Sequence, residues 1–82
     1  MLDVLVITAH QCLFEGKANQ VILPGESGVF EVLRFHRPII STLLAGYIVI
    51  DDQTISIERG VAKVERNAVT LIVDPTDEVS GG

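Results

Sequence analysis

Short apolar runs follow one another along the chain, separated at intervals of about eight to ten residues by Gly, Pro, Asp or Asn. The runs are rich in the β-branched residues Val and Ile, which favour strands over helices. From Thr54 to Glu58 polar and apolar residues alternate, which is the period of a half-buried strand. The runs that predict strands are residues 3–9, 12–15, 21–23, 29–33, 39–44, 47–50, 54–58, 61–65 and 68–73.

No stretch shows a helical period long enough for a βαβ crossover, so we exclude a parallel sheet. A single helical turn in residues 39–44, after Pro38, is an alternative, but a strand is favoured there. The pattern therefore predicts an all-β domain, an antiparallel β-sandwich or flattened barrel of about eight to ten short strands without a C-terminal helical hairpin. We expect the β-sandwich domain in residues 1–75 and a flexible C-terminal tail in residues 76–82.

The composition is that of a globular domain, with 48% hydrophobic and 21% charged residues. Only four aromatic residues occur, three Phe and one Tyr, so we expect an aliphatic core. The formal net charge of −5 argues against nucleic acid as a partner, because phosphate binding needs clustered Lys and Arg. No apolar run approaches the ~18 residues that a membrane span requires, so direct membrane insertion is not expected.

The single cysteine, Cys12, cannot form an internal disulfide, which favours a reducing compartment. We interpret it as a small strand residue and not as a reactive thiol. The N-terminus carries Asp3 where a signal peptide has a basic segment, and the bulky Gln11 precedes the cysteine. Neither a signal peptide nor a lipoprotein leader is therefore expected.

The stretch from Val21 to Pro38 combines turn residues and cations more densely than any other part of the chain. It begins as a strand, turns through Gly25–Gly28, resumes as a strand and ends in a polar segment with two arginines and a histidine. This stretch is therefore the first candidate for a contact surface.

No pattern of catalytic or ligand-binding residues is complete. Ser27 lies near two glycines, but a nucleophile elbow needs a second glycine where this chain has Val29. The acidic pair Asp51–Asp52 is expected to form a hairpin turn, and a phosphate-binding loop is absent. Three potential metal ligands lack the spacing of a known site: His10, Cys12 and His36. We therefore predict no catalytic residue, cofactor, metal site or small-molecule substrate, and no enzymatic activity of the chain's own.

Several short motifs occur in the order typical of one family. They are Leu-Phe-x-Gly in Leu13–Gly16, the Pro-Gly turn in Val21–Gly28, His-x-Pro in His36–Leu43, a Gly-aliphatic strand in Gly46–Ile50 and a Val-Thr strand in Val69–Asp74. The chain thus resembles the N-terminal β-sandwich domain of the epsilon subunit of the bacterial F-type ATP synthase, the counterpart of the mitochondrial delta subunit.

The chain departs from the family pattern mainly in one place. Where the family has Gly-hydrophobic-Leu-Pro-Gly-His-Ala-Pro, this sequence has Glu31, Arg34, Phe35 and Arg37 in place of two glycines, a proline and an alanine. Because a non-glycine residue is costly at positive φ, the turn is expected to differ in shape. The inhibition and ATP binding that the family's C-terminal helices mediate are not carried over to this sequence.

The resemblance implies a non-catalytic central-stalk subunit of a proton- or sodium-translocating F-type ATP synthase, peripheral to the cytoplasmic side of the bacterial plasma membrane. It would couple the gamma subunit, bound on an apolar patch of one sheet face, to the membrane c-ring. The residues expected at the c-ring end are Gly25, Glu26, Ser27, Gly28, Arg34, Phe35, His36, Arg37 and Pro38. The alternative is a stand-alone β-sandwich interaction module that is not part of a rotary ATPase.

Overall fold

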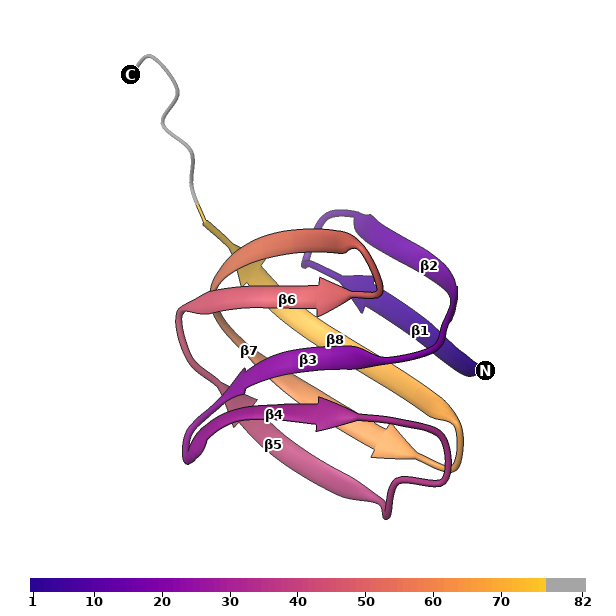
Figure 1. The fold of residues 1–82 in the computed structure, drawn as a ribbon. Coiled ribbons are helices and arrows are strands. Elements are labelled where there is room, and N and C mark those ends of the chain that lie inside the picture. The colour runs from indigo at the N-terminus through magenta and orange to yellow at the C-terminus, as the bar shows by residue number, and fades with distance from the viewer. Residues whose placement is uncertain (77–82) are drawn as a thin grey trace.

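The computed structural model describes residues 1–76, and its regular elements are all β-strands (Figure 1). The strands are β1 (Leu2–Ile7), β2 (Cys12–Ala18), β3 (Val21–Gly25), β4 (Gly28–Val32), β5 (Ile39–Leu43), β6 (Gly46–Ile50), β7 (Gln53–Glu65) and β8 (Ala68–Pro75). The all-β prediction is therefore confirmed. The run for which a helical turn was the alternative forms strand β5.

The strands form two layers that share one long strand, β7 (Figure 1). The first part of β7 pairs with β6 up to Ile57, and the second part pairs with β5 from Gly60 onward. Between them the register with β8 shifts between Ile57 and Arg59, as it does at a β-bulge. The prediction of two separate strands here is wrong, because the bulge bends the backbone without ending the strand.

The first and last described strands, β1 and β8, pair in parallel next to the edge strand β2. β1 lies between β2 and β8, and its residues Asp3–Ile7 run parallel to Ala68–Ile72. The exclusion of parallel pairing is wrong for this one pair. A parallel pair requires a long connection but not a helical one, and here the six strands from β2 to β7 provide it.

The core between the layers is aliphatic, as expected, and no polar or charged side chain of the described residues is buried in it. Phe14 and Phe30 are partly buried and pack against its margin. Burying each large aliphatic side chain stabilises the fold by roughly 1.5–3 kcal/mol. The largest fully buried side chains are Leu2, Leu23, Leu43, Ile48, Ile50, Ile57 and Leu71.

Thr76, the first residue of the predicted tail, is hydrogen-bonded to the domain. Thr76 donates its backbone N–H to the carbonyl oxygen of Ser56 at 3.1 Å, and the hydroxyl groups of the two residues lie 2.7 Å apart. Thr76 is thus fixed to β7 and does not belong to a free tail. The rest of the predicted tail, residues 77–82, lies outside the described residues.

Gly60 should be intolerant of any side chain. A Cβ at this position would lie 2.8 Å from the carbonyl oxygen of Ile72 and 2.8 Å from Cγ1 of Val73. We expect Gly60→Ala to lower the free energy of unfolding by about 1–3 kcal/mol, because the overpacked strands must move apart. Urea denaturation measures this loss.

Gly16→Ala is the matched control, because a Cβ at Gly16 would make only an ordinary contact, 3.4 Å from Cζ of Phe14. We expect a change within about 0.5 kcal/mol for this variant. Equal losses for the two variants would contradict the close approach of β7 and β8 at Gly60.

Candidate functional site

The nine residues predicted to form one contact surface lie in two separate places. Gly25–Gly28 forms the hairpin turn between β3 and β4, whereas Arg34–Pro38 follows β4 at its other end (Figure 1). The strand between them, Gly28–Val32, has five residues and spans roughly 17 Å. The structure therefore does not bring the two segments together, and each is a candidate surface of its own.

In the β3–β4 turn the special residues have packing roles. Gly25 is buried and pairs with Gly28, so that only Glu26 and Ser27 form the exposed turn. A Cβ on Gly25 would lie 2.7 Å from the ring of Phe30, and Gly28 has a φ of 124°, which favours glycine. The glycines of this turn are thus explained by the fold alone.

The loop after β4 contains a strained aromatic residue. The His36 N–H donates to the Leu33 carbonyl oxygen at 3.2 Å, which closes a tight turn with Phe35 as its third residue. Phe35 has a φ of 65°, and this left-handed conformation costs a non-glycine residue about 1–2 kcal/mol. Phe35 thus adopts the conformation that is costly for a non-glycine residue. The side chain is 80% exposed, so its own packing does not compensate the cost.

Asn67 holds this loop in place from the β7–β8 turn. Its side-chain Oδ1 accepts the backbone N–H of Phe35 at 3.1 Å, and its carbonyl oxygen accepts the N–H of Asp3 at 2.7 Å. One residue therefore joins three segments that are distant in sequence. Asn67 lies between the predicted strands 61–65 and 68–73, and nothing in its local sequence indicates these partners.

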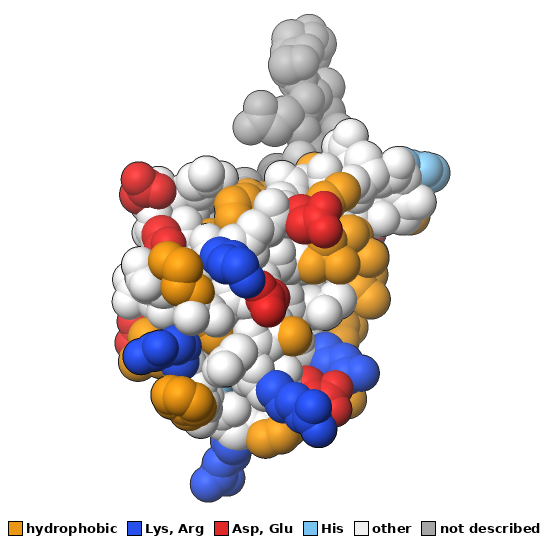
Figure 2. Space-filling view, turned by 90° about the vertical axis from the view of Figure 1, so that its right-hand side faces the viewer, with side chains coloured by type: hydrophobic (Ala, Val, Ile, Leu, Met, Phe, Trp, Pro, Cys, Tyr) orange, Lys and Arg blue, Asp and Glu red, His pale blue; other side chains and the backbone are white. Residues whose placement is uncertain are grey.

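Three exposed arginines lie on the Phe35 loop and on the β7–β8 turn that is hydrogen-bonded to it. The guanidinium carbon of Arg34 lies 5.5 Å from the ring centroid of Phe35, within the range of a cation–π contact. Arg37 and Arg66 are also exposed, and Arg66 directly precedes Asn67. Figure 2 views the molecule from this end, and Lys and Arg side chains gather in its lower half. We refer to this set as the arginine tip: Arg34, Phe35, Arg37 and Arg66.

His36 lies partly buried beside the arginine tip. Its ring nitrogen Nδ1 lies 2.8 Å from the carbonyl oxygen of Arg37. Since a carbonyl oxygen only accepts hydrogen bonds, Nδ1 carries the proton in this contact. The imidazole thus supports the local backbone before Pro38.

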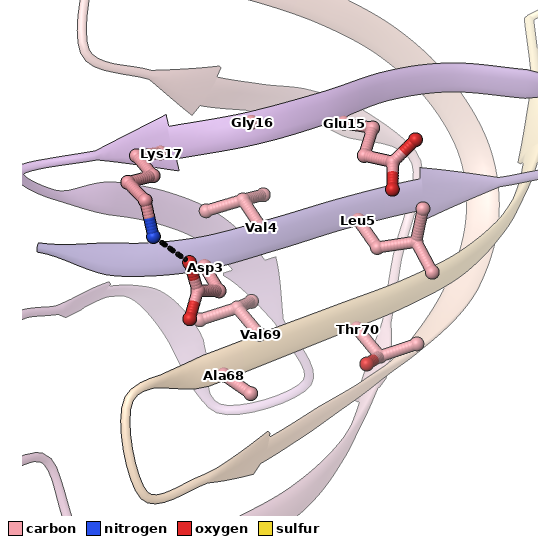
Figure 3. A pocket seen from close by; sticks show the side chains of 9 residues that line it. All are labelled: Asp3, Val4, Leu5, Glu15, Gly16, Lys17, Ala68, Val69 and Thr70. Carbon is pink, nitrogen blue, oxygen red and sulfur yellow. Dashed lines mark hydrogen bonds and ion pairs between the residues drawn. The ribbon is translucent and has the colours of Figure 1, made fainter.

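One layer of the sandwich consists of β5, β7, β8, β1 and β2. On its outer face, apolar residues of neighbouring strands lie opposite one another. Ile72 is 55% exposed and Val61 is 44% exposed, although the outward face of a single domain is usually polar. Figure 3 shows the neighbouring row, with Leu5 between Glu15 and Thr70. The apolar row consists of four residues paired across the strands, Val61, Ile72, Ile7 and Cys12, and Thr42 on β5 pairs with its end at Val61.

The described residues offer little for catalysis. No group of three or more His, Cys, Asp or Glu side chains is placed to hold a metal ion within residues 1–76. Asp51, which we interpreted as an exposed turn residue, accepts the backbone N–H groups of Asn19 and Gln20 at 3.0 and 3.1 Å. Its carboxylate therefore joins two loops.

Within residues 1–76, no helix has the length and apolar character needed to cross a membrane.

Comparison with known proteins gives consistent relatives. A family model described as the β-sandwich domain of the ATP synthase delta/epsilon chain matches residues 1–77. The ATP synthase epsilon chain of Bordetella avium is 35% identical over 78 residues, which cover 89% of this chain and 55% of the relative. That of Leptospira borgpetersenii is 32% identical over 77 residues, covering 89% and 61%. The chain thus spans little more than half the length of these relatives.

Solved structures with the same fold come from mitochondrial ATP synthases. A chain in the Euglena gracilis OSCP/F1/c-ring structure superposes with a TM-score of 0.79 at 14% identity, covering 98% of this chain and 56% of that chain. A chain in the Tetrahymena thermophila central stalk/c-ring structure gives 0.74 at 12% identity, covering 99% and 75%. At these identities the likeness shows the fold.

Replacing Phe35 by glycine should stabilise the domain. Phe35→Gly removes the left-handed strain without loss of buried surface, so we expect the free energy of unfolding to rise by about 1 kcal/mol. Phe35→Ala is the matched control, since it removes the ring but keeps the Cβ that causes the strain. Urea denaturation of both variants separates the two effects, and an equal gain for alanine would contradict the backbone explanation.

Asp3 should have a pKa below that of an ordinary aspartate because of Lys17 (Figure 3). The hydrogen bond from the Lys17 ammonium group, and then its charge, lower the pKa of the Asp3 carboxyl group. Because the pKa is lower in the folded state, the pair stabilises the fold above the unfolded pKa. This contribution is lost as the pH falls through the folded pKa.

In Lys17→Met we therefore expect the pKa of Asp3 to rise towards its ordinary value, as measured by NMR titration of the carboxyl carbon. Lys63→Met, which removes a cation paired with Glu65 instead, should leave that pKa unchanged. An Asp3 pKa that is the same with and without Lys17 would rule out the ion pair in solution.

Proposed function

Because the chain belongs to the family of the ATP synthase delta/epsilon β-sandwich domain, we propose that it is a non-catalytic rotor subunit that couples the gamma subunit to the c-ring. The complex would be a proton- or sodium-translocating F-type ATP synthase. The subunit would be peripheral to the cytoplasmic side of the bacterial plasma membrane. Its relatives with 35% and 32% identity are epsilon chains of ATP synthases.

The apolar row is the observation that carries the gamma-subunit part of the proposal. It crosses the layer on its outward side, where Val61 and Ile72 pair with each other and Ile72 pairs with the half-buried Ile7. Scattered apolar residues are normal on a protein surface, but a contiguous row marks an interaction site. A partner that covers the row would bury this surface, which is how stable subunit contacts gain affinity.

The c-ring contact is proposed for the end of the molecule with Arg34–Pro38. This end carries exposed cations and an exposed ring on a hydrogen-bonded turn. The Gly25–Gly28 turn lies at the other end of β4, so we place it outside this contact. The proposal therefore keeps Arg34, Phe35, His36, Arg37 and Pro38 as c-ring residues and leaves the hairpin turn out of that contact.

A charge placed on the apolar row tests the gamma-subunit contact. We expect Ile72→Lys to weaken binding of the gamma subunit by roughly tenfold or more, because burying an unpaired ammonium group in an interface is costly. Isothermal titration calorimetry with the gamma subunit of the same organism measures the affinity. Urea denaturation verifies that the exposed substitution leaves the fold intact.

Val29→Lys is the matched control, because Val29 is a strand residue that is 74% exposed on β4, away from the apolar row. We expect this variant to bind the gamma subunit as the unmodified chain does. If the unmodified chain shows no affinity for the gamma subunit, the rotor function is wrong and the stand-alone interaction module takes its place.

A further inference from the structure

We propose that the arginine tip is a docking point for an acidic loop of the partner, with Phe35 as an apolar anchor between charge pairs. The inference rests on the proposed function, in which this end faces the c-ring. It specifies the chemistry of the contact: carboxylate groups of Asp or Glu on the partner facing Arg34, Arg37 and Arg66, and an apolar notch for the ring.

The distribution of cations is the first observation. The chain has six Lys and Arg residues, of which three form ion pairs within it: Lys17 with Asp3, Arg59 with Asp74 and Lys63 with Glu65. Among residues 1–76, the other three have no carboxylate within 4.0 Å, and they are the three arginines of the tip. In a chain of net charge −5, the Lys and Arg side chains without an ion pair among residues 1–76 thus lie in one loop and in the turn hydrogen-bonded to it.

The residue type is the second observation. The guanidinium group of arginine presents planar, paired N–H donors that match the two oxygens of a carboxylate. Arginine is therefore favoured over lysine where a protein binds carboxylate groups. Arg and aromatic residues are also enriched among the residues that dominate binding energy at interfaces. Phe35 is the most exposed large apolar side chain of the described residues, at 80%, and the contact with Arg34 keeps part of its face covered.

The backbone is the third observation. Phe35 retains a left-handed conformation that glycine would adopt at no cost. The Leu33–His36 hydrogen bond and the Asn67 side chain fix this turn. A turn that is already fixed loses little conformational entropy on binding. Less of the interaction energy of its ring and cations is therefore spent on ordering the loop, and more of it contributes to affinity. Strain that the surroundings hold in place at an exposed residue is typical of a binding site.

A protein loop fits these features better than a membrane surface does. Attachment to anionic lipid uses many cations and a broad apolar face that enters the headgroup region. The tip has three cations and one ring on a chain of net charge −5, which anionic lipid repels. A compact, rigid group of this size matches a single loop with complementary charge.

The test measures binding of the chain, in complex with the gamma subunit, to the detergent-solubilised c-ring immobilised on a sensor surface. We expect Arg34→Gln/Arg37→Gln and, separately, Phe35→Ala each to weaken c-ring binding roughly tenfold or more. The double variant should also lose most of the salt dependence of binding, because screened charge pairs cause it. The affinity of each variant for the gamma subunit is measured in parallel and should be unchanged.

Lys17→Gln/Arg59→Gln is the matched control, since it removes the same number of charges from cations that are paired within the chain. We expect its c-ring affinity to stay within about twofold of the unmodified chain. If the unmodified complex binds the c-ring and the tip variants bind equally well, the inference is wrong while the proposed function stands. If the unmodified complex does not bind the c-ring, the proposed c-ring contact fails, and the inference fails with it.

Carbodiimide coupling identifies the partner group. The carbodiimide adds to the carboxyl group of an Asp or Glu side chain on a c-subunit loop to give an O-acylisourea. In Arg34→Lys the new amine should attack this ester, form the amide bond and release the substituted urea. Mass spectrometry of the cross-linked peptide locates that acid, and the absence of any such cross-link would overturn the proposed carboxylate contact. Binding to phosphatidylglycerol vesicles that the double variant abolishes, without c-ring binding, would assign the tip to lipid and overturn it as well.

Discussion

The bulge in β7 is the constraint on which both layers of the sandwich depend. Before it, Ile57 faces the core, and after it Ala62 and Val64 do, so the inward positions change from odd to even residue numbers. Because side chains alternate along a strand, the bulge moves Val61 and Lys63 to the outer face. Without it the ammonium group of Lys63 would enter a core that has no polar side chain among the described residues. The apolar row exists because of this change of register.

The arginine tip depends on a different kind of constraint, a small set of hydrogen bonds that act on the backbone. Asn67 accepts the Phe35 N–H through its side chain and the Asp3 N–H through its carbonyl oxygen. The loop after β4, the β7–β8 turn and the start of β1 are therefore positioned together. The strain at Phe35 is local, whereas the bonds that retain it come from the rest of this end of the molecule. Shape and charge at the tip are set by the fold as well as by the loop's own sequence.

The local sequence pattern was sufficient to predict the strands but not to predict which strands pair with each other. The apolar runs predicted an all-β fold and an aliphatic core, because alternation and β-branched residues act within a few positions. They missed the continuity of β7 and the parallel pair of β1 and β8, since both depend on residues far apart in sequence. The resemblance identified both candidate loops but not their separation, although a five-residue strand between them implies it. The backbone of Phe35 was missed because Asn67 lies outside its sequence neighbourhood.

The parallel pairing of the first and last strands has a consequence for synthesis on the ribosome. β1 can form its hairpin with β2 as soon as both have left the exit tunnel, but its other edge has to wait for β8. The ribosome must extend the chain as far as Ala68 before Asp3 meets its partner, and an open strand edge can pair with other chains during that time. Topologies with such non-local pairing also fold slowly. Asp3 and Lys17, paired across the β1–β2 hairpin, place charges beside this edge while it is still uncovered.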